Sequence, residues 1–206
     1  MAHAVASTLD QAPERGIEVY NQKVGMWVFL CSEVMFFTGL IGSYIVLRFG
    51  AADTWGAPNE VLAVPVTAVN TFILICSSVT MVKAFAAAQA GDQKGIRLFL
   101  CATAALGALF LSIQVYEYTH LIEHGAWQGS HGFTPAAGLY GSTFFTMTGF
   151  HGFHVLIGVV CLTWASIQSF KGRWGADNTH GIEVLGLYWH FVDLVWIILF
   201  TIVYLI

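Results

Sequence analysis

Apolar residues gather in five long stretches along this chain, and short polar segments separate the stretches. They cover residues 24–47, 62–88, 96–122, 139–170 and 184–206. Each is longer than the roughly 20 residues with which a helix crosses a bilayer. Backbone groups that face lipid must bond within their own segment, so we expect helices, and the strict alternation of a transmembrane barrel is absent. The pattern therefore predicts an all-α fold, a polytopic membrane bundle of five transmembrane helices.

The composition agrees with a membrane protein and excludes several other classes. Of the 206 residues, 57% are hydrophobic and 10% are charged, whereas soluble domains carry roughly 25% charged residues. The formal net charge is −4, so no basic surface is expected to hold nucleic acid. A soluble enzyme, a disordered tail and a nucleic-acid-binding module are thereby excluded.

The first 23 residues are polar and precede the apolar stretches. Their charged residues are not compatible with a secretory signal peptide, which needs a short apolar core. We expect two parts: a polar cytoplasmic arm over residues 1–23 and a single five-helix transmembrane domain over residues 24–206.

Lysine and arginine are distributed unevenly between the two sides of the predicted bundle. Arg48 falls on one side, and the other side holds Arg15, Lys23, Lys83, Lys94, Arg97, Lys171 and Arg173. Cytoplasmic loops of membrane proteins carry an excess of these residues. The N-terminus is therefore predicted to be cytoplasmic and the C-terminus outside, with the longest link, residues 123–138, on the outer side.

Glu33 stands out in the first span because it lies close to the predicted centre of the bilayer. It is about nine residues into the span, at ~1.5 Å per residue. An ionisable group at this depth costs roughly 2.5 kcal/mol or more, so we expect it to be protonated or paired with a buried donor. Two interpretations stay open: a proton-active or interface carboxyl, and a structural acid bonded to another helix.

Polar side chains also occur within the third, fourth and fifth spans. Spacings of three or four residues place the members of each pair on one helix face. These residues are Gln114 and Glu117, His151 and His154, and His190 and Asp193. We interpret them as polar contacts to lipid or to neighbouring helices.

Histidines within membrane helices also suggest a haem or metal site. Axial ligands of one haem must lie at similar depth on facing helices, and the depths of His151, His154 and His190 do not match well. The cysteines show no zinc-binding spacing: Cys31, Cys76, Cys101 and Cys161. We therefore expect no metal or haem ligand in this chain, and a stand-alone haem b membrane electron carrier is the alternative.

Four motifs together resemble one known family. They are SEVMFFTG at 32–39, QVYEY at 114–118, TGFHGFHVLIG at 148–158 and YWHFVDLVW at 188–196. In this order they are similar to subunit III of the haem-copper respiratory oxidases, in the short five-helix bacterial form. The long form has two further spans at its start, which this chain lacks.

The resemblance implies a role that spacing alone does not give. A subunit III is a non-catalytic accessory subunit of a proton-pumping cytochrome c oxidase, a translocase and oxidoreductase. The haems and copper lie in partner subunits, and the expected partners are subunits I and II, membrane lipid and further respiratory complexes. The family supports the stability and proton uptake of subunit I and binds phospholipid. The implied location is the bacterial inner membrane.

The resemblance also implies roles for individual residues. Glu33 matches the family's intramembrane glutamate and is expected to face subunit I. His151 and His154 match lipid-contacting positions, and Glu183 matches an acid near the cytoplasmic surface.

Other functions compete with this interpretation. A quinol oxidase or a relative that accompanies nitric oxide reductase would use a similar subunit. The haem b carrier belongs to a different class, and so does a small proton-coupled transporter, for which the unbroken spans are unfavourable.

Overall fold

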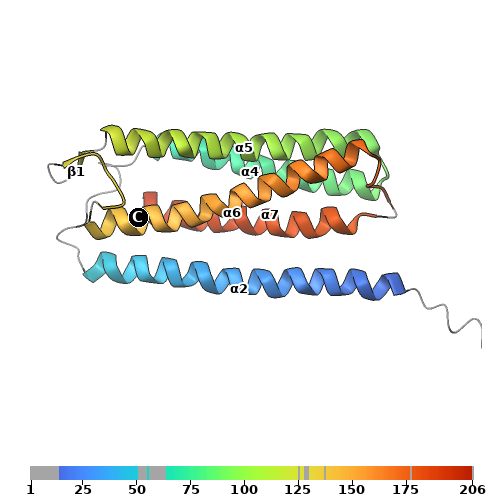
Figure 1. Ribbon diagram of the computed structural model, residues 1–206, viewed down its shortest axis with the longest axis horizontal. Helices are drawn as coiled ribbons and strands as arrows, with labels where there is room; N and C mark the ends of the chain where they lie inside the picture. The colour runs from blue at the N-terminus through green and yellow to red at the C-terminus, as the bar shows by residue number, and fades with distance from the viewer. Residues whose placement is uncertain are drawn as a thin grey trace, which may run out of the picture.

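The computed structural model describes residues 14–50, 55, 64–124, 126–127, 130–136, 138–176 and 178–205. Five long helices run nearly along one axis (Figure 1). They are α2 (Glu14–Gly50), α4 (Val64–Gln89), α5 (Gln93–His124), α6 (Gly138–Phe170) and α7 (His180–Phe200). Each is long and apolar enough to cross a membrane, which confirms the predicted five-helix membrane fold.

Two short features lie at one end of the bundle, outside the five helices. The link after α5 contains an antiparallel pair of two-residue strands, β1 (Ala126–Trp127) and β2 (Ser130–His131). The chain leaves α7 through a π-helical turn, η2 (Thr201–Leu205).

Helix α2 begins earlier than the predicted first span. Residues 14–23 of the predicted polar arm continue the helix, while residues 1–13 lie outside the described residues. Glutamate, arginine, lysine and glutamine favour helix and need no lipid contact. The arm and the first span therefore share one helix over the described part of the chain.

Helices α6 and α7 each pack against three others: α7 against α4, α6 and α2, and α6 against α5, α7 and α2. Helix α5 packs on α4 and α6 on the far side from α2 (Figure 1). Helix α2 contacts only α7 and α6 extensively. Among its described side chains, the buried ones are Leu30, Phe37 and Tyr44. Their spacing of seven residues is two helical turns, so one narrow stripe faces the bundle.

Two tryptophans of α7 fill the middle of the bundle. Trp189 and Trp196 are fully buried, and each indole N–H donates to a hydroxyl of α4. Trp189 donates to Ser77 Oγ at 3.0 Å, and Trp196 donates to Thr71 Oγ1 at 2.9 Å. An indole buried in this way needs such a partner.

Small residues make room for Trp189. A Cβ atom added to Gly107 of α5, or to Gly158 of α6, would lie 2.6 Å from its ring. Neither position can therefore hold a side chain without movement of the ring.

Candidate functional site

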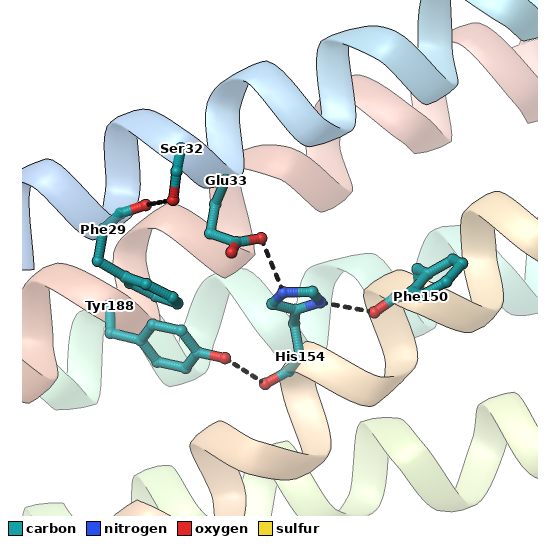
Figure 2. A network of polar contacts seen from close by, with 6 residues as sticks. All are labelled: Phe29, Ser32, Glu33, Phe150, His154 and Tyr188. Atoms are coloured by element: carbon teal, nitrogen blue, oxygen red, sulfur yellow. Dashed lines mark hydrogen bonds and ion pairs between the residues drawn. The ribbon is translucent and has the colours of Figure 1, made fainter.

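Glu33 of α2 meets His154 of α6 inside the membrane-spanning region. The carboxyl oxygen Oε2 lies 3.0 Å from the imidazole Nε2 (Figure 2). The other ring nitrogen, Nδ1, lies 2.8 Å from the backbone carbonyl of Phe150. Tyr188 of α7 donates its hydroxyl to the His154 carbonyl at 2.9 Å. Helix α2 is joined at this point to two helices from the C-terminal part of the chain.

The hydrogen bonds determine how protons are arranged in the pair. A backbone carbonyl can only accept, so Nδ1 of His154 carries a hydrogen. Nε2 then either accepts a proton from a neutral Glu33 carboxyl or, as imidazolium, donates to its carboxylate. In both arrangements one proton lies between the two residues, and the pair has no net charge.

The surroundings isolate the pair from water. The side chains of Glu33 and His154 are 18% and 12% exposed in this chain. The ring centroids of Phe36 and Phe37 lie 6.3 and 5.2 Å from that of the His154 imidazole. Glu33 is within about 4 Å of the middle of its apolar segment, Asn21–Gly50, at ~1.5 Å per residue. Both proton arrangements leave the pair without net charge, which is what this depth favours.

A cavity of about 560 Å³ lies between α2, α6 and α7, with the pair in its wall. Most of its lining is apolar, including Met26, Phe29, Ile157 and Trp164. Glu33, His154 and Tyr188, which carry hydrogen-bonding side chains, are also in its lining. The cavity thus has long apolar walls and one hydrogen-bonding region.

His151 and His154 do not act together, although they are three residues apart. His151 is fully buried in the bundle and its Nε2 donates to the carbonyl of Val192 at 3.1 Å. Its ring packs against Trp196, with ring centroids 4.7 Å apart. Of the two predicted roles, lipid contact or interhelical contact, the structure places His151 in the interhelical one.

Gln114 and Glu117 of α5 make separate interhelical contacts. Gln114 Nε2 donates to the carbonyl of Thr148 on α6 at 3.1 Å. Glu117 Oε1 accepts from Thr67 Oγ1 on α4 at 2.5 Å. Both side chains are buried, so they bond the bundle together rather than reach lipid.

His190 and Asp193 lie on the other side of α7, next to α4. His190 Nδ1 is 2.5 Å from Ser78 Oγ. Asp193 is 7% exposed, and its Oδ1 has no hydrogen-bond partner in the described structure. This cluster is separate from the Glu33–His154 pair.

Glu183, at the start of α7, pairs with Lys23 of α2 at 2.5 Å. His180 lies 3.9 Å from the other carboxyl oxygen, within the same helix. The ion pair joins α2 to α7 at the end of the bundle that is rich in lysine and arginine.

The sequence interpretation identified the acids and histidines but not their partners. Thr67 and Ser78 are small polar residues in the second span, and Tyr188 belongs to the last quoted motif. Polar residues in an apolar span were the available signal for the first two.

Within the described residues, no three histidine, cysteine, aspartate or glutamate side chains gather as a metal site would require.

Comparison with known proteins agrees with the quoted motifs. The family model of cytochrome c oxidase subunit III matches residues 13–206. A Corynebacterium diphtheriae protein named cytochrome c oxidase subunit 3 is 39% identical over the whole of both chains. Proteins of the same name from Thermostichus vulcanus and Bacillus sp. strain PS3 are 37% and 35% identical. They align with 88% and 97% of this chain, and with 86% and 94% of their own lengths. The chain therefore belongs to the cytochrome c oxidase subunit III family, as its motifs predicted.

Proposed function

We propose that this chain is a non-catalytic accessory subunit of a proton-pumping cytochrome c oxidase in a bacterial inner membrane. It packs on subunit I, beside subunit II, and the haems and copper belong to those partners. Its N-terminus faces the cytoplasm. The family, the five membrane helices and the uneven distribution of lysine and arginine support this proposal.

The Glu33–His154 pair carries the proposal. It lies near mid-membrane, and it links α2 to α6 where α2 is otherwise buried along one narrow stripe. Ionisable groups at this depth mark functional positions by default. The pair holds α2 in place, so that the exposed side of α2 is presented to subunit I. The proton within the pair makes it suited to support proton uptake by the neighbouring subunit.

Phospholipid is the expected occupant of the cavity beside the pair. Its walls are apolar over most of their length, as an acyl chain requires. Tyr188, Glu33 and His154 also line it, and their polar groups are bonded within the chain, so they need no partner from the acyl chain. We propose that one acyl chain lies between α2 and the α6–α7 surface and strengthens their contact.

The histidine contacts favour the accessory role over a haem b carrier. Both ring nitrogens of His154 are engaged, by Phe150 and Glu33. His151 Nε2 is bonded to a backbone carbonyl. A haem ligand would have to give up such a bond. The names of the relatives favour cytochrome c over quinol as electron donor of the complex.

The test uses the whole complex, purified in mild detergent through a tag on this chain. We expect oxidase subunits and their haem bands to accompany the wild-type chain. Glu33→Leu should keep the haem spectrum, weaken retention of this subunit and shorten the time for which the oxidase stays active. Glu33→Gln keeps a hydrogen-bonding group, so its subunit retention and active lifetime should lie between those of the wild type and of Glu33→Leu.

Glu123→Gln is the matched control, because Glu123 is an exposed glutamate near the end of α5. It should behave as wild type. Loss of haem from the Glu33→Leu complex would contradict the accessory role. A chain that arrives alone with a haem b band would favour the electron carrier instead.

A further inference from the structure

The surface between α4 and α7 carries polar groups at the depth where lipid is most apolar. Asp193 is at the middle of the fifth membrane segment, His180–Leu205. Ser78 is within about 3 Å of the middle of Val64–Gln89, at ~1.5 Å per residue. His190 lies one turn before Asp193. Hydrocarbon at this depth can neither donate nor accept a hydrogen bond.

Internal bonds leave part of this cluster unsatisfied. Ser78 Oγ is 2.5 Å from His190 Nδ1, and this is the hydrogen bond that the His190 ring makes among the described residues. Nε2 of the same ring has no partner there, and the residue is partly exposed. Asp193 Oδ1 is also without a partner, but it is enclosed within the chain. A polar atom that faces hydrocarbon without a partner costs free energy.

The cluster borders an exposed apolar surface. Asp193 is nearly buried and His190 and Ser78 are partly exposed. Four large side chains on the same sides of these helices are exposed: Ile75 and Val82 on α4, and Leu194 and Ile197 on α7. We call these seven residues the α4/α7 face. A phospholipid could cover its apolar part, but a lipid headgroup remains at the interface, about 15 Å from mid-membrane.

We propose that the α4/α7 face is the docking surface for a transmembrane helix of another oxidase subunit, and that this helix brings a hydrogen-bonding side chain to His190 Nε2. Serine, threonine, asparagine and glutamine side chains can both donate and accept, so they meet this requirement for either tautomer of His190. Polar bonds of this kind join membrane helices where apolar burial gives no driving force. The inference rests on the proposed function, because it requires a larger complex.

Photo-crosslinking in native membranes tests the position of the partner. A photoreactive amino acid replaces Leu194 or Val82, both exposed and outside the polar cluster. The matched control replaces Leu109, an exposed leucine near the middle of α5. We expect the probes at 194 and 82 to join this chain to another oxidase subunit and the probe at 109 to react with lipid. Lipid adducts alone at 194 and 82 would overturn the docking surface.

Retention of partner subunits tests the polar contact itself. An average interhelical hydrogen bond of roughly 0.6 kcal/mol corresponds to a change of about threefold in association. His190→Leu should therefore weaken retention about threefold. Thr163→Val is the control, since Thr163 is exposed on α6 and bonds its own helix at Val159. Unchanged retention in the His190→Leu variant would contradict the proposal.

The two proposals fail in different ways. If no oxidase subunit accompanies the tagged wild-type chain, the proposed function is wrong. If the subunits accompany it and the probes at Leu194 and Val82 mark lipid, only the docking surface is wrong.

Discussion

At the scale of single residues, a spacing of three on a helix does not give two side chains the same role. His151 and His154 differ by about 60° around α6, at 3.6 residues per turn. This difference is enough for His151 to point at α7 and for His154 to point at α2. The sequence predicts contacts to lipid or to neighbouring helices for both, and only the position of α6 between two neighbours separates their contacts.

Gly158 provides a prediction at the same scale. A Cβ at this position would lie 2.6 Å from the ring of Trp189, which is fully buried and cannot move freely. Gly158→Ala should therefore lower stability by about 1–3 kcal/mol, the usual cost of overpacking. The measurement is the midpoint of thermal unfolding of the complex, followed by loss of helical circular dichroism in detergent.

Gly149→Ala is the control on the same helix, since nothing lies within 4 Å of its added Cβ. The higher helix propensity of alanine should leave stability unchanged or raise it by up to about 1 kcal/mol. Equal destabilisation by the two substitutions would show that the fit around Trp189 is not the cause.

At the scale of elements, α2 is the helix least embedded in the bundle. Its stripe of Leu30, Phe37 and Tyr44 faces α6 and α7, and Lys23 reaches Glu183 at one end. The side chains of that ion pair are 45% and 28% exposed, so solvent reduces its contribution to between about 0 and 1 kcal/mol. Packing of the stripe, with the Glu33–His154 bond, accounts for most of the attachment.

The attachment of α2 leads to a comparison of two substitutions. Phe37→Ala removes a buried ring from the stripe and should cost ~3 kcal/mol, the lower end for buried aromatic truncations. Lys23→Met removes the ion pair, keeps a similar length and should cost less than about 1 kcal/mol. Thermal unfolding of the tagged complex measures both. A larger effect of Lys23→Met would mean that the ion pair, and not packing, holds α2.

The helices could be predicted from hydropathy, but their ends and the bonds between them could not. The predicted fourth span, 139–170, agrees with α6 within one residue, whereas α2 extends ten residues before the predicted 24–47. Hydropathy detects only the part of a helix that lies in hydrocarbon. A helix can continue into water, where its side chains are polar and give no apolar signal. The π-helical turn after α7 changes the local period over five residues, too few for a sequence pattern to reveal.

The partners of the site residues could not be predicted without knowing how the helices pack. Glu33 and His154 are 121 positions apart, and neither motif indicates that the two residues are in contact. The depth of Glu33 predicted a buried donor or a protonated state, and the pair with His154 is compatible with both. Ser78 gave a weaker signal, because serine within a membrane helix usually bonds its own backbone.

At the scale of the whole molecule, cationic side chains gather at one end of the bundle. The start of α2, the α4–α5 turn and the α6–α7 link meet there, opposite β1 and the C-terminus (Figure 1). Lys94 and Arg97 lie at the start of α5, next to the α4–α5 turn, and Lys171 and Arg173 lie in the α6–α7 link. The fold thus brings the predicted cytoplasmic residues to a common surface. Arg48 lies near the opposite end of α2.

This distribution predicts the orientation in the membrane, which can be tested on one helix. Lys94 and Glu123 are exposed near opposite ends of α5, about 44 Å apart at ~1.5 Å per residue. In a chain whose four cysteines are replaced, Lys94→Cys should react with a membrane-impermeant maleimide only in inverted vesicles. Glu123→Cys should react only in intact spheroplasts. The reverse result would place the lysine- and arginine-rich end outside, together with the Lys23–Glu183 pair. Support of proton uptake from the cytoplasm would then lose its structural basis, while membership of the family would stand.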